Sequence, residues 1–146
     1  MKLLFFAETE SAAETFLKTA LLGDVFEAVW TTVLPLPSQL VMKIDIELFE
    51  CKAFLGSPEV LTQPQAIPLL AVIMEWVFLR NKNTFSEQCP KDKVIRLAKL
   101  FLENDYTPFR IIDQRGKLEK LDTSNFGTDW KCNVAWISNS IATQYL

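Results

Sequence analysis

The sequence predicts a mainly α-helical single domain, a bundle of helices with one small β-hairpin, and three observations lead to this expectation. A nearly continuous apolar segment occupies residues 67–79, in the middle of the chain. Several other stretches lack Gly and Pro over lengths typical of helices, and capping residues precede some of them. The length of 146 residues, with 49% hydrophobic and 23% charged residues, fits one globular domain at 1–146.

The apolar segment reads IPLLAVIMEWVFL and carries a single charge, on Glu75. As a helix it would be about 20 Å long, which is too short for the roughly 30 Å hydrocarbon layer of a membrane. A segment that is apolar on all sides and too short to cross a bilayer is typical of a buried core helix. We therefore expect a central helix at about 66–80, with Pro64 and Pro68 near its start.

The N-terminal third predicts two short helices. Residues 3–7 form either a short strand or the lead into a helix. Ser11 and Glu14 have the spacing of a capping box, and Gly23 ends the helix that this box opens. Asp24 begins a second helix, which ends before Pro35.

Residues 39–55 are ambiguous between strand and helix. Met42, Ile44 and Ile46 alternate with charged residues, as in a half-buried strand. Val41, Ile44, Leu48, Cys51 and Leu55 also form a helical stripe. Because the stretch runs for seventeen residues without Gly or Pro, its length favours a helix.

The C-terminal half predicts one clear helix, one hairpin and one ambiguous tail. After Pro90 an amphipathic pattern runs to about residue 104. Two short apolar runs flank the turn residues 113–116 and predict a β-hairpin at about 109–121. The tail at 129–145 fits a helical stripe, whereas its first half also fits one face of a strand. We expect a helix there, because the helical stripe extends further.

Three cysteines, at 51, 89 and 132, are far apart and odd in number, which argues against a disulfide framework. The apolar run at 3–7 is too short for a secretory signal and leads directly into acidic residues. Together these features predict a reducing cytoplasm and no membrane association. Cys51 would then be a small buried hydrophobic residue.

The absent residue types restrict the chemistry. The chain contains no histidine, which removes the most common neutral-pH general base and the most common zinc ligand. The cysteines lack C-x-x-C spacing, and the four glycines lie too far apart for a phosphate-binding loop. We expect no metal and no cofactor, and a non-catalytic role. A carboxylate-dependent enzyme or small-ligand binder, with a pocket beside Glu75, is the alternative.

Charge is distributed unevenly. Residues 1–79 carry ten acidic and four basic residues, a net charge of −6, whereas residues 80–146 carry a net charge of +3. The basic residues Lys91, Lys93, Arg96 and Lys99 share the predicted helix, and Arg110 and Arg115 lie in the hairpin. They suggest a nucleic-acid-associated protein as a further alternative. A solvated helix face explains them better, since no nucleic-acid-reading motif accompanies them and the whole chain is acidic.

The acidic half provides the main functional hypothesis. We expect an acidic surface beside an aromatic ring to bind a basic protein partner, and its residues are Asp45, Glu47, Glu50 and Phe54. Trp130 and Trp136 are candidate anchors of the same interface, although such aromatic residues more often complete a core. The sequence thus predicts a non-catalytic protein-binding module, such as an inhibitor or an immunity-type protein. It does not determine the oligomeric state.

Overall fold

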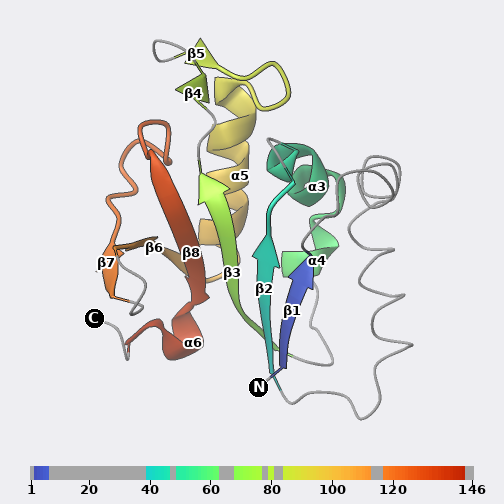
Figure 1. Cartoon of the computed structure of the whole chain (residues 1–146), viewed down its shortest axis with the longest axis vertical. Helices are drawn as coiled ribbons and strands as arrows, with labels where there is room; N and C mark the ends of the chain where they lie inside the picture. The colour runs from blue at the N-terminus through green and yellow to red at the C-terminus, as the bar shows by residue number, and fades with distance from the viewer. Residues whose placement is uncertain are drawn as a thin grey trace.

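A computed structural model describes residues 2–6, 39–46, 49–62, 68–76, 79–80, 84–112 and 117–143 of the chain. Its main feature is a mixed six-stranded β-sheet with short helices, so the expected all-α bundle is wrong (Figure 1). In sheet order the strands are β1 (Lys2–Phe6), β2 (Leu40–Ile44), β3 (Leu69–Trp76), β8 (Cys132–Ser138), β6 (Tyr106–Ile111) and β7 (Leu118–Lys120). The helices described are α3 (Glu50–Gly56), α4 (Glu59–Thr62), α5 (Lys91–Glu103) and α6 (Asn139–Ala142).

The sheet has a parallel half and an antiparallel half. Strands β1, β2 and β3 run parallel to one another, whereas β8, β6 and β7 are each antiparallel to the strand before them in the sheet. A separate two-stranded ribbon, β4 (Leu79–Arg80) with β5 (Thr84–Phe85), follows β3 and lies near one end of α5 (Figure 1). The three parallel strands therefore end at the same edge of the sheet.

The expected central helix at about 66–80 is instead the central strand β3, which pairs with β2 on one side and with β8 on the other. Val72, Met74 and Trp76 point to one face, and Ala71 packs on the other. A strand covered on both faces has an almost uniformly apolar sequence, which periodicity cannot distinguish from a buried helix. Its importance to the core was expected correctly, but its secondary structure was not.

Both ambiguous segments combine the two alternatives in sequence. The stretch at 39–55 begins as strand β2 and continues as helix α3, so the single expected helix is wrong. The tail at 129–145 begins as strand β8 and ends in the single turn α6. In each case pairing with a neighbouring strand makes the first half of the segment a strand. The local sequence pattern does not contain that neighbouring strand, so it cannot predict the pairing.

Three local expectations agree with the structure. Helix α5 begins after its N-cap Pro90 and buries its apolar stripe, which consists of Val94, Leu97, Ala98 and Phe101. Strands β6 and β7 pair as an antiparallel hairpin, although the hairpin extends the main sheet. The first alternative for residues 3–7 is also correct for residues 3–6, which lie in β1, and residue 7 is outside the described residues. The two helices expected between residues 11 and 34 lie outside the described residues.

The sheet separates two hydrophobic clusters, which we name after the helix that packs on each. The α5 face carries Met42, Ile44, Trp76 and Trp136 against α3 and α5. The α6 face carries a smaller cluster, whose buried members are Ala71, Phe109, Ala135, Ile137 and Ala142. No helix in the described part of the chain has the length and apolar character needed to span a membrane.

Candidate functional site

Three carboxyl groups converge where the parallel strands end. Asp45 directly follows β2, Glu75 is the penultimate residue of β3, and Glu50 begins α3. In open sheets with parallel strands, ligands commonly bind beyond the carboxyl ends of those strands. We call Asp45, Glu50 and Glu75 the carboxylate edge and treat it as the candidate site.

Asp45 and Glu75 are neighbours across the two strands. The paired residues of β2 and β3 end at Ile44 and Met74, and each acid is the next residue along its chain segment. Since side chains alternate along a strand and both of these partners pack on the α5 face, the two acids belong to the α6 face. Glu75 is exposed, and Lys43 Nζ lies 3.4 Å from Asp45 Oδ2 in a half-exposed ion pair.

Glu50 is buried at the start of α3, which packs on the α5 face, and only 2% of the residue is exposed. Its Oε1 accepts a long hydrogen bond of 3.4 Å from the backbone N–H of Ile46, and its Oε2 has no hydrogen-bond partner among the described residues. Burial raises the pKa of Glu50 to about 7, against an ordinary value of 4.5. The backbone N–H groups of Glu50 and Ile46 oppose this increase, whereas the charges of Asp45 and Glu75 add to it.

This arrangement has two chemical capabilities. The exposed carboxylates create a negative potential that attracts a cationic group. The same potential contributes to the raised pKa of Glu50, because nearby negative charges oppose its ionisation. A carboxyl group with a pKa near 7 can also accept or release a proton at neutral pH. Within the described ranges, no group of three or more Cys, Asp or Glu side chains is placed to hold a metal ion.

The structure divides the acidic residues that were expected to bind a partner. Asp45 is partly exposed, Glu50 is buried, and Glu47 lies outside the described residues. The carboxylate that joins Asp45 at the surface is Glu75, which the sequence had assigned to the alternative ligand-binding hypothesis. Because only strand pairing brings residues 45 and 75 together, no local sequence signal connects them.

The three aromatic residues of the predicted interface lie in the core. Phe54 and Trp136 are fully buried and Trp130 is 6% exposed. Phe54 packs edge-on against Phe101, with ring centroids 5.1 Å apart. Trp136 stacks on the same Phe101 ring, with centroids 4.6 Å apart. Trp130 and Trp136 also contact Trp76, at 5.3 and 5.5 Å. None of the three is available as a surface anchor in this structure.

The basic residues of α5 lie at the surface, as a solvated helix face requires. Lys91, Arg96 and Lys99 are exposed and Lys93 is half-buried. The ammonium of Lys99 sits 5.0 Å from the ring centroid of Phe126, a cation–π contact. The proposed extension of this patch into the hairpin is limited, because Arg110 pairs with Glu119 at 3.7 Å and Arg115 is outside the described residues.

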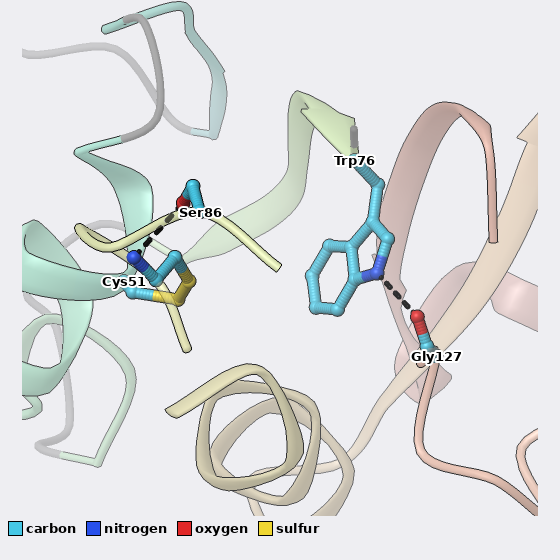
Figure 2. Close-up of a disulfide and its surroundings, with 5 residues drawn as sticks. Cys51, Trp76, Ser86 and Gly127 are labelled. Carbon is cyan, nitrogen blue, oxygen red and sulfur yellow. Dashed lines mark hydrogen bonds between the residues drawn. A yellow bond between two sulfur atoms is a disulfide. The ribbon is translucent and has the colours of Figure 1, made fainter. Parts of the chain in front are cut away.

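Cys51, which directly follows Glu50 in α3, forms a disulfide with Cys89, contrary to the expectation that these cysteines stay unpaired (Figure 2). Their Cα atoms are 5.6 Å apart, a common separation for bridged cysteines, and both residues are fully buried. The backbone N–H of Cys89 donates to Ser86 Oγ at 3.0 Å. A separation of 38 residues carries no spacing signal, so only the packing of α3 near α5 reveals the pair.

Comparison with known protein families, with curated proteins and with solved structures finds no match to this chain.

Proposed function

We propose that this chain is a non-catalytic protein-binding module whose carboxylate edge binds a basic protein partner. Proteins that block a basic enzyme, such as inhibitors or immunity-type proteins of nucleases, have this chemistry. The binding surface would centre on Asp45 and Glu75. The aromatic residues of the original hypothesis take no direct part.

The observation that carries the proposal is the pairing of two surface carboxylates where β2 and β3 end, near enough to a third, buried carboxyl group for their charges to act on it. Both surface charges raise the pKa of Glu50, so they act on the same small volume. Glu75 forms no ion pair within the described part of the chain, and the single cation beside Asp45 is Lys43. A lysine or arginine of a partner would relieve this repulsion, and complementary charge of this kind mainly accelerates association.

The test begins with capture of a partner by crosslinking the intact chain in its native host. Association rates are then measured across a salt series for wild type and for Asp45→Lys with Glu75→Lys. We expect the double variant to associate at least about tenfold more slowly at low salt, with the difference shrinking as salt screens the charges.

The matched control is Glu103→Lys with Glu119→Lys, which makes the same change in net charge at exposed sites on α5 and on β7, away from the edge. An unchanged rate in the edge variant would overturn the proposal. An equal loss in both double variants would also overturn it, because the effect would then depend on total charge only.

A second function is favoured by one specific feature, the unpartnered Oε2 of Glu50 together with its pKa near 7. In a carboxylate-dependent enzyme or a small-ligand binder, Glu50 would exchange a proton with the bound molecule. Glu50→Gln separates the two functions: it would abolish proton exchange, whereas it would leave the exposed charges of Asp45 and Glu75 in place. A partner association rate unaffected by Glu50→Gln supports the binding module.

The cellular compartment also belongs to this proposal. The cytoplasm was expected because the cysteines seemed unpaired, and the Cys51–Cys89 disulfide removes that reason. Disulfides between buried cysteines are typical of oxidising compartments. Thiol labelling in the native host, under conditions that trap the oxidation state, decides between a reducing cytoplasm and an oxidising compartment. Two cysteines that do not react with the label indicate an oxidising compartment.

A further inference from the structure

A cavity lies between strands β6 and β7 and the loop at 121–130, at the end of the sheet opposite to β1. Its volume is about 360 Å³. This is at the small end of the range for ligand pockets in proteins, roughly 300–1,000 Å³. Arg110 contributes a cation to its lining, Glu119, Asp122 and Asp129 contribute carboxylates, and Asn125 contributes an amide. The buried residues Leu121 and Trp130 supply its apolar part.

The loop that forms one wall is fixed to the core. Trp130 Nε1 donates to the carbonyl oxygen of Asp122 at 3.0 Å, and Trp76 Nε1 donates to the carbonyl oxygen of Gly127 at 2.8 Å (Figure 2). Phe126 and Gly127 both have left-handed backbones, with φ of 53° and 74°. A wall held in this way keeps its polar groups in place before any ligand arrives, which reduces the entropy cost of binding.

Some lining groups are already satisfied within the protein. The carboxylate of Asp122 accepts hydrogen bonds from the N–H and hydroxyl of Ser124, at 2.9 and 2.8 Å, and these bonds lower its pKa. Asn125 Oδ1 accepts from the N–H of Gly127 at 3.1 Å, which leaves its amide NH₂ as a donor. Asp122 and the Asn125 oxygen therefore shape the cavity and are not its free acceptors.

Other lining groups remain available. Within the described residues, the side chain of Asp129 forms no ion pair or hydrogen bond. Arg110 has one long contact, from Nη1 to Glu119 Oε2 at 3.7 Å, with both side chains about half exposed. Such a pair is weak, and it leaves most guanidinium N–H donors free. The cavity thus offers a free carboxylate, cationic donors and an apolar surface together.

We propose that this cavity binds a small zwitterion of the α-amino acid class. Its carboxylate would accept hydrogen bonds from Arg110, its ammonium would pair with Asp129, and an apolar side chain would rest on Leu121 and Trp130. A ligand with one charge only would leave either the free N–H donors of Arg110 or the carboxylate of Asp129 without a partner as water is displaced, which weakens binding. This site is independent of the carboxylate edge and of the proposed protein partner.

The experiment titrates three matched compounds into the intact, isotopically labelled chain and follows NMR shifts of the Asn125 side-chain amide and the Trp130 indole N–H. The compounds are L-leucine, 4-methylpentanoate, which lacks the ammonium, and 3-methylbutylamine, which lacks the carboxylate. We expect saturable shifts with L-leucine and at least about tenfold weaker binding of both single-charge analogues. Analogues that bind as tightly as L-leucine, or no saturable shift with L-leucine, would overturn the proposal.

Variants then test the assigned contacts. Asp129→Asn and Arg110→Gln change exposed residues and should keep the fold, which the remaining amide spectrum verifies. Each should weaken L-leucine binding at least about tenfold, whereas the control Lys91→Gln on α5 should bind as wild type does. Wild-type affinity in both Asp129→Asn and Arg110→Gln would show that the cavity does not use these charges, and the proposal would fail.

Discussion

The two faces of the sheet differ in what they bury. The α5 face contains four aromatic side chains in mutual contact, Trp76, Trp130, Trp136 and Phe101, and it also holds the buried Glu50 and the disulfide. The α6 face is covered by smaller residues, mainly alanine and isoleucine around Phe109, and Lys43, Asp45 and Glu75 border it.

This difference separates stability from interaction. Large apolar side chains removed from water contribute most of the folding free energy, so the α5 face should dominate stability. Charged residues that stay in contact with water contribute little to folding and remain free to bind other molecules. Substitutions on the α5 face should therefore change the free energy of unfolding, whereas those at the border of the α6 face should change association.

The largest expected effect is Trp136→Ala on the α5 face. Trp136 is fully buried, and its loss would remove contacts with Phe101, Trp76 and Trp130 and leave a cavity. We expect a loss of about 3–5 kcal/mol in the free energy of unfolding, measured in urea. The comparison is Ile73→Ala on the half-buried α6 face, and an equal or larger loss there would contradict the distinction between the faces.

The disulfide gives the next effect, because it closes a loop of 38 residues that includes all of β3. Chain-entropy estimates for loops of this length give about 4 kcal/mol of stabilisation. Cys51→Ser with Cys89→Ser should lower the free energy of unfolding by about this amount. Cys132→Ser, at the free cysteine, should not lower it in this way. In the oxidised wild type we expect one thiol to react after denaturation without reductant and three with it. Three reactive thiols in both conditions would contradict the bond.

Glu50 tests the α5 face through pH. Its pKa is about 7 in the folded protein and 4.5 ordinarily, so below about pH 4.5 it is protonated in both states. As the pH rises to 7 only the unfolded chain ionises, which stabilises the unfolded state and costs about 3 kcal/mol by neutral pH. Glu50→Gln should remove this decline, and chemical denaturation between pH 4 and 8 measures it. A decline of equal size in both proteins would contradict the assignment.

Gly127→Ala should produce the smallest of these effects, about 1–3 kcal/mol. The backbone of Gly127 is left-handed, and an added Cβ would lie 2.8 Å from Trp130 Cε3. The loop at 121–130 and the Trp130 indole must then shift to make room for the added Cβ. Gly56→Ala, at the exposed end of α3, is the control and should not destabilise, since alanine favours helices. Thermal unfolding of both variants makes the comparison.

The sequence alone determined elements whose pattern is complete within one segment. Helix α5 has an apolar stripe, a polar face and a proline at its start, so its bounds and buried residues followed directly. The β6–β7 hairpin was equally local, because its turn residues and its two strands are adjacent in the chain. The acidic character of the first half was also evident, and it led to Asp45 and Glu50.

The tertiary structure decided everything that depends on a distant partner. Residues 69–76 form a strand because β2 and β8 supply hydrogen bonds and both faces are covered, and the resulting apolar run resembles a buried helix. The carboxylate edge exists because strand pairing brings residue 75 beside residue 45, and the disulfide exists because Cys51 and Cys89 meet where α3 packs near α5. Local sequence encodes amphipathic periodicity and turns, whereas contacts between distant segments arise only when the chain folds.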